Sequence, residues 1–96
     1  MVVWSDIAKA DIQHIFDFIA HDPKQYARKV VAEIVAKTDI LEELPKIGKV
    51  VPEINQDAVR ELHIYSYRIL YEITSPNIVV LAVLHQRRNF DVNNLR

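Results

Sequence analysis

Residues 60–88, RELHIYSYRILYEITSPNIVVLAVLHQRR, decide the fold of this chain of 96 residues. Over residues 60–73 apolar and polar side chains roughly alternate, which is the period of half-buried antiparallel strands. The pair Tyr65-Ser66 interrupts this alternation and predicts a tight connection between two strands. Residues 75–77, Ser-Pro-Asn, predict the next turn, because proline fixes φ and asparagine tolerates left-handed backbone.

A third strand is predicted over residues 78–84, which are apolar without a break. A short Val- and Ile-rich run that follows a turn is typical of a strand buried on both faces. This strand carries four polar side chains to the end of a rigid element: His85, Gln86, Arg87 and Arg88. We therefore expect a functional site at this strand end, together with Arg60 and Arg68 from the two preceding strands.

Two amphipathic helices are predicted in the first half of the chain. The first runs from about Asp6 to Ala20, with Ser5 as its N-cap and apolar residues at spacings of three and four. The second begins after residues 21–23, His-Asp-Pro, and runs to about Leu44, just before a proline. Because so few residues join them, the two helices should pack as an antiparallel hairpin.

The predicted order of elements is strand, helix, helix, strand, strand, strand, with Val2–Trp4 as the first strand. One sheet with the helical hairpin on one face is the simplest way to bury both helices. We therefore predict a single α+β domain over residues 1–96, a small antiparallel sheet with an N-terminal two-helix hairpin on one face. The apolar run 78–84 would also place side chains on the other face, which needs a cover. Gly48, the only glycine, is expected to take a positive φ in the connection before the sheet.

Composition argues against several classes of protein. The chain has no cysteine, which excludes disulfides and thiol catalysis and fits the reducing cytoplasm. No apolar run approaches the roughly 18 residues of a membrane span, and the N-terminus shows no signal-peptide pattern. A cytoplasmic protein without membrane association is therefore expected. The net charge of −1 disfavours a protein whose main task is to grip a nucleic-acid backbone.

The sequence carries no common signature of a cofactor or metal site, so none is expected. One glycine cannot build a Gly-rich phosphate loop, and the four histidines fall in different elements at no metal-ligand spacing. His85 and its neighbouring arginines could act in RNA cleavage, because histidine titrates near neutrality and arginine stabilises developing phosphate charge. They could equally form a solvated strand end. Arg68 could bind phosphate or a partner carboxylate, or form an ion pair with Glu72 on one face of its strand.

Four segments in order resemble the RelE/ParE superfamily of bacterial type II toxins. They are A-x-x-D-I-x-x-I (Ala8–Ile15), L-P-x-I-G-x-x-V-P-E (Leu44–Glu53), R-E-L-x-x-x-x-Y-R-I-L-Y (Arg60–Tyr71) and V-L-H-x-R-R (Val83–Arg88). The resemblance covers nearly the whole chain and implies the same sheet and helical hairpin that the periodicity predicts. It also implies a cognate antitoxin, whose C-terminal segment wraps the toxin in a hetero-oligomer.

The resemblance leaves two mechanisms open. RelE-like members cleave messenger RNA in the ribosome, and this interpretation would make Arg68, His85 and Arg87 catalytic. However, Val59 and Glu61 stand where those members carry lysines.

ParE-like members instead inhibit DNA gyrase by binding it, without enzymatic activity. The segment Val83–Arg87 resembles their L-H-x-R ending, and the chain as a whole resembles ParE more closely. This interpretation implies a target-binding surface that includes four residues: Arg60, Arg87, Arg88 and Phe90.

Overall fold

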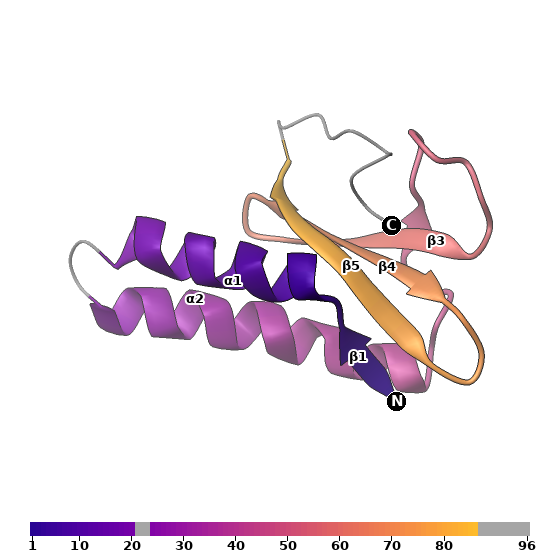
Figure 1. Ribbon diagram of the computed structural model, residues 1–96, viewed down its shortest axis with the longest axis horizontal. Coiled ribbons are helices and arrows are strands. Elements are labelled where there is room, and N and C mark those ends of the chain that lie inside the picture. Colours follow the sequence, from indigo (N-terminus) through magenta and orange to yellow (C-terminus); the bar gives the residue numbers. More distant parts are fainter. Residues whose placement is uncertain (21–23, 87–96) are drawn as a thin grey trace.

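The computed structural model describes residues 1–20 and 24–86 of the chain. Its elements are β1 (Val2–Trp4), α1 (Asp6–Ile19), α2 (Lys24–Lys37), the 3₁₀ helix η1 (Thr38–Glu42), β2 (Lys49–Val50), β3 (Val59–Ile64), β4 (Tyr67–Ile73) and β5 (Ile78–His85). The strands form one sheet in the order β1-β5-β4-β3-β2, and α1 and α2 lie side by side against it (Figure 1). The predicted α+β class and the helical hairpin are confirmed.

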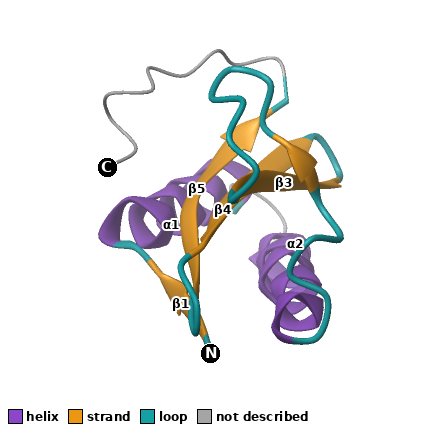
Figure 2. Cartoon of the chain, turned by 90° about the vertical axis from the view of Figure 1, so that its right-hand side faces the viewer, coloured by secondary structure: helices purple, strands orange, loops and turns teal. Residues whose placement is uncertain are grey.

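The sheet is mixed. The strands from β2 to β5 are antiparallel to their neighbours, whereas β1 runs parallel to β5, with Val2 opposite Ile78 (Figure 2). A parallel neighbour is possible because the helical hairpin, rather than a tight turn, carries the chain away from β1. The predicted connection at Tyr65 is confirmed, and Tyr65 itself has a φ of 53°. Strand β2 was not predicted, since two residues are too few to show a period.

The second helix is shorter than the sequence predicts. It ends as an α-helix at Lys37 and continues as η1 to Glu42. At the change, the buried hydroxyl of Thr38 donates to the carbonyl oxygen of Val35 at 2.7 Å. A threonine that bonds to the preceding turn competes with regular helical bonding. Leu44, predicted to end the apolar stripe, is instead half exposed.

Apolar side chains pack on both faces of the sheet, as the run 78–84 predicts. The helix-side core includes Ile34, Ile69 and Tyr71. On the opposite face a smaller core includes Leu70 and Leu81, and residues 51–54 fold over it. Strand β5 shows no alternation because it contributes apolar side chains to both cores. A register shift also places one extra residue of β5 against β4.

Side chains at the start of α1 bond to the part of the β5 edge that lies beyond the end of β1. The Ser5 hydroxyl accepts from the amide of Ala8 at 3.1 Å, as an N-cap should, and donates to the carbonyl of Leu81 at 3.0 Å. Six residues later, the carboxylate of Asp11 accepts from the amide of Val83 at 2.9 Å. These two helix side chains bond to strand backbone beyond the end of β1, and they fix α1 against the C-terminal end of β5.

Gly48 does not have the positive φ that we expected. It is required for a different reason, namely a close approach between β2 and the rest of the sheet. A Cβ atom at this position would lie 2.6 Å from the carbonyl oxygen of Glu61 and 2.6 Å from the hydroxyl of Tyr71. That hydroxyl accepts from the Gly48 amide at 3.0 Å, so the backbone must come this close.

We expect Gly48→Ala to lower the free energy of unfolding by about 1–3 kcal/mol, the usual cost of overpacking a tight site. Urea denaturation at pH 7 measures the change. As the control, Lys46→Ala alters an exposed side chain nearby and should change stability by less than about 1 kcal/mol. Equal stability of Gly48→Ala and the parent would show that β2 can move aside at no cost.

Candidate functional site

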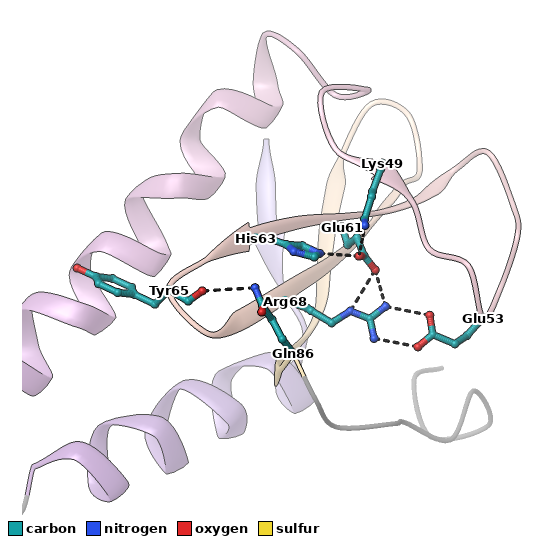
Figure 3. A network of polar contacts seen from close by, with 7 residues as sticks. All are labelled: Lys49, Glu53, Glu61, His63, Tyr65, Arg68 and Gln86. Carbon is teal, nitrogen blue, oxygen red and sulfur yellow. Dashed lines mark hydrogen bonds and ion pairs between the residues drawn. The ribbon is translucent and has the colours of Figure 1, made fainter.

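Arg68 lies at the centre of a buried ionic cluster on the sheet face opposite the helices. Its Nη1 and Nη2 atoms donate to the two carboxylate oxygens of Glu53 at 2.8 and 2.9 Å. Its Nε and Nη2 atoms donate to Glu61 Oε2 at 3.2 and 2.5 Å. The other oxygen of Glu61 lies 2.6 Å from His63 Nε2 and 3.7 Å from Lys49 Nζ (Figure 3). We call these five residues the Arg68 cluster.

The strand register explains most of this arrangement. Glu61 and His63 are two residues apart on β3 and therefore share a face, and His63 lies opposite Arg68 on β4. Glu53 comes from the segment that folds over this face. One interpretation of the sequence placed Arg68 in an ion pair on a strand face, and the structure shows it paired with Glu53 and Glu61.

Mutual contacts favour the charged forms of Arg68, Glu53 and Glu61. Hydrogen bonds from Arg68 lower the pKa of Glu53. Burial acts to raise the pKa of Glu61, but hydrogen bonds from Arg68 and His63 outweigh it and the pKa is lowered. The hydrogen bond to Glu53 is the main reason that the pKa of Arg68 is raised. The guanidinium therefore stays charged, and two carboxylates neutralise it.

These shifts predict a loss of stability in acid. A carboxylate whose pKa is lower in the folded state stabilises the fold above its unfolded pKa, and this stabilisation is lost as the pH falls through the folded value. The ordinary pKa of both glutamates is 4.5. We therefore expect the free energy of unfolding to decrease as the pH is lowered below about that value. Urea denaturation between pH 7 and pH 3 measures it. Because the Gln side chain cannot titrate, the stability of Glu53→Gln should decline less steeply with falling pH. An identical decline in the variant and the parent would show that Glu53 does not contribute to the acid sensitivity.

His85 lies on the helix side of the sheet, away from Arg68. It is opposite Tyr67 in the strand register, and the two rings meet edge to face at 6.0 Å between centroids. His85 lines a cavity of about 360 Å³ between α1 and the end of β5. Because Tyr67 and Arg68 are consecutive on β4, their side chains point to opposite faces. The structure therefore does not bring together the sequence candidates Arg68 and His85.

An aromatic groove surrounds His85. The cavity beside α1 and a second hollow of about 330 Å³ are both lined by Phe18, Tyr67 and His85, and Tyr26 and Tyr65 line only the second. We call these five residues the aromatic groove. Three of its side chains are strongly exposed: Phe18 by 75%, Tyr26 by 51% and Tyr65 by 47%. The groove is therefore an apolar surface open to solvent.

The groove is held in shape by polar contacts at its rim. The hydroxyl of Tyr65 donates to the carboxylate of Glu33 on α2, and Gln86 Nε2 donates to the carbonyl oxygen of Tyr65 at 3.4 Å. Sequence reasoning missed this surface. The available signal was a second stripe on α1, formed by Asp11, His14 and Phe18 at spacings of three and four, all of which line the cavity.

Of the remaining predicted site residues, the structure describes only Arg60, whose side chain bonds within the protein. The guanidinium of Arg60 donates to the Asp57 carboxylate at 2.7 Å and to the carbonyl oxygens of Asp57 and Gly48, each at 2.9 Å. Its side chain is 14% exposed. Arg87, Arg88 and Phe90 lie outside the residues that the structure describes.

The sequence matches the family described as the ParE toxin of the type II toxin-antitoxin system, parDE, over residues 2–90. The chain belongs to this ParE toxin family. No curated protein sequence gives a significant match. The family assignment therefore rests on a profile that spans almost all of the chain, including every described element.

Two solved structures share the fold of this ParE-family chain. A chain from the chromosomal ParDE toxin-antitoxin system of P. aeruginosa is 22% identical with a TM-score of 0.72, over 88% of this chain and 92% of that chain. A chain from the RelBE2 toxin-antitoxin complex of Mycobacterium tuberculosis is also 22% identical, with a TM-score of 0.61, over 88% of this chain and 95% of that chain. The fold of this chain is therefore shared with a chain from a ParDE system and a chain from a RelBE2 complex.

The described part of this ParE-family toxin shows no metal site and no membrane-spanning helix. Within residues 1–20 and 24–86, no group of three or more histidine and acidic side chains is placed to hold a metal ion. In the same ranges no helix is long and apolar enough to cross a membrane.

Proposed function

We propose that this ParE-family toxin acts by binding a protein, DNA gyrase, and that a cognate antitoxin neutralises it in a hetero-oligomeric complex. The observation that supports this proposal is that the guanidinium of Arg68 is already hydrogen-bonded to carboxylates. The residue that an RNA-cleaving toxin would use to hold phosphate already holds two carboxylates, Glu53 and Glu61.

A nuclease interpretation requires cations and an acid/base group around one phosphate. Arg68 is only 7% exposed, and Glu61 contributes a buried negative charge where phosphate would have to approach. His85 is on the other face of the sheet, so it cannot share a phosphate with Arg68. The net charge of −1 gives no long-range attraction to ribosomal RNA. These features disfavour messenger RNA cleavage, which is the alternative function.

A protein-binding role fits the aromatic groove. Protein interfaces are enriched in aromatic side chains, and the few residues that dominate affinity often fill apolar pockets. Phe18, the most exposed large side chain of the groove, lies between two hollows that a partner can fill. Arg87, Arg88 and Phe90 follow His85 in the sequence, and we propose that they extend the same contact surface.

The first experiment is DNA supercoiling by purified gyrase, with and without the toxin freed of its antitoxin. We expect inhibition that added cognate antitoxin reverses. A toxin shortened after Arg88 is the informative variant, since it should keep its fold and lose inhibition. If a folded sample at large molar excess leaves supercoiling unchanged but cleaves messenger RNA on programmed ribosomes, the proposal is wrong and the nuclease alternative holds.

A further inference from the structure

The carboxylate of Asp11 bonds to the edge of β5 and also lines the cavity beside α1. Its Oδ2 atom accepts from the amide of Val83 at 2.9 Å, and Asp11 itself is half-buried. The pairing of β1 with β5 ends at Val80. The amide of Val83 therefore lies where, in the described part of the chain, β5 has no neighbouring strand on that side. Asp11 supplies the acceptor that a neighbouring strand would otherwise provide.

The start of α1 is attached to β5 without Asp11. The amide of Ser5 donates to the carbonyl oxygen of Val80 at 3.0 Å, and the Ser5 hydroxyl donates to that of Leu81 at 3.0 Å. Ala8 and Ile15 of the same helix belong to the helix-side core. A carboxylate beside an apolar cavity loses hydration, and only hydrogen bonds offset that loss. Attachment of the helix alone therefore does not explain an acidic residue at position 11.

The bond of Asp11 is a second anchor, which constrains how α1 is oriented on the strand (Figure 1). Ser5 and Asp11 are six residues apart, which is about 9 Å along a helix axis. Their strand partners, Leu81 and Val83, are two residues apart, which is about 7 Å along a strand. A single contact would let the helix pivot, whereas two contacts at different places set its angle and its position along β5. The Asp11 bond therefore helps to fix where the second half of α1 lies.

Phe18 depends on this placement. It follows Asp11 by seven residues, which is about two helical turns, so both side chains lie on the same side of α1 and line the same cavity. The Phe18 side chain is 75% exposed, so few contacts of its own hold the ring. On the strand, His85 follows Val83 by two residues and meets the ring of Tyr67 edge to face. A shift of α1 therefore changes the spacing between Phe18 and the two rings of the sheet.

We infer that Asp11 is a positioning residue for the aromatic groove. Its bond to the Val83 amide sets the spacing between Phe18 on α1 and the rings of Tyr67 and His85 on the sheet. A preformed groove binds its partner more tightly than a groove that must be ordered on binding. Asp11 therefore raises the affinity for a partner without contacting that partner. This effect on affinity rests on the proposed function, whereas the effect on the shape of the groove does not.

Two substitutions at position 11 separate the hydrogen bond from the charge. Asp11→Asn loses the charge but keeps an oxygen that can accept from the Val83 amide, whereas Asp11→Leu is of similar size and has no acceptor. The ring-proton chemical shifts of Tyr67 and His85 report the position of the nearby Phe18 ring. In Asp11→Leu we expect these shifts to change and hydrogen exchange at the Val83 amide to become about 10-fold faster, because local opening is easier. Asp11→Asn should match the parent in both measurements.

The affinity for gyrase, measured by calorimetric titration, should follow the same order. We expect Asp11→Asn to bind within about two-fold of the parent and Asp11→Leu to bind about three- to ten-fold more weakly, since an ordering cost returns. The control is Asp17→Asn, which removes a charge from an exposed residue of α1 that lines neither hollow, and it should bind as the parent does. If Asp11→Asn binds as weakly as Asp11→Leu, the partner reads the charge and the inference is wrong. Unchanged affinity in Asp11→Leu despite altered ring shifts would also overturn it.

Asp11→Glu keeps the test decisive if Asp11→Leu does not fold. It retains the charge but displaces the carboxylate by one methylene group, so it should bind gyrase more weakly than Asp11→Asn. The opposite order, with Asp11→Glu the tighter binder, would contradict positioning, because charge rather than the place of the acceptor would then decide affinity.

Phe18→Asp distinguishes a failure of this inference from a failure of the proposed function. If Phe18→Asp binds gyrase as the parent does, the aromatic groove is not the contact and the proposed function is wrong. The ring shifts and the exchange rate then still test the placement by Asp11, and values unchanged in Asp11→Leu would overturn it. Self-association of Asp11→Leu with unchanged ring shifts would show instead that the bond only seals the edge of β5.

Discussion

Arg68→Met is expected to lower the free energy of unfolding by about 3–5 kcal/mol, the usual cost of removing one partner from a buried ion pair. The reason is Glu61, whose side chain is only 2% exposed. Methionine fills much of the space of the arginine stem, but it leaves that carboxylate with a half-exposed histidine and a 3.7 Å contact to Lys49. Urea denaturation at pH 7 measures the loss.

Two further variants separate a structural role of Arg68 from a functional one. Arg68→Lys keeps the charge but cannot bridge two carboxylates with a planar fork, so its stability should be intermediate. Glu53→Gln should cost less than Arg68→Met, because the Glu53 side chain is 33% exposed. A fully stable Arg68→Met protein that has lost toxicity would contradict the structural role and restore Arg68 as a functional group.

Phe18→Asp is expected to weaken binding of the cognate antitoxin or of gyrase by about 30- to 1000-fold, the range of an interface hot spot worth 2–4 kcal/mol. Aspartate removes the aromatic ring between the two hollows and places a charge where a partner must exclude water. The fold should be unaffected, because Phe18 is 75% exposed. Calorimetric titration with the antitoxin and the supercoiling assay measure the two affinities.

The matched control for Phe18→Asp is Ile7→Asp. Ile7 is an apolar residue of the same helix, exposed by 43%, and it lines neither hollow of the aromatic groove. We expect Ile7→Asp to bind both partners as the parent does. Equal losses in the two variants would mean that any charge on α1 disturbs binding and that the aromatic groove is not the contact.

Local pattern was sufficient to predict the longer strands and both helices, but not the full order of strands in the sheet. The alternation over residues 60–73 and the break at Tyr65-Ser66 are set by neighbours in sequence, so β3 and β4 could be predicted. The parallel pairing of β1 with β5 joins residues far apart in the chain, which no periodicity encodes. For the same reason Gly48 was assigned a positive φ, when its constraint is the approach of Tyr71 from another strand.

The candidate site was harder to predict than the fold. The sequence singled out Arg68 and His85 as site residues, but spacing could not show that Arg68 faces Glu53 and His85 faces the cavity beside α1. Glu53 lies in a segment with no period, so nothing indicated that it folds onto β4. The aromatic groove joins Phe18 to Tyr65 across the helix–sheet contact, and only the tertiary structure places them together.

The position of β5 has a consequence for how the toxin is made in the cell. This strand lies between β1 and β4 in the sheet, although it is the last strand in the described part of the chain. During translation β1, α1 and β4 emerge before β5, the strand against which all three pack. A ribosome that stops before Ile78 therefore releases a chain with no completed sheet, whose open edges favour aggregation or proteolysis. The sheet can therefore be completed only after β5 has been synthesised.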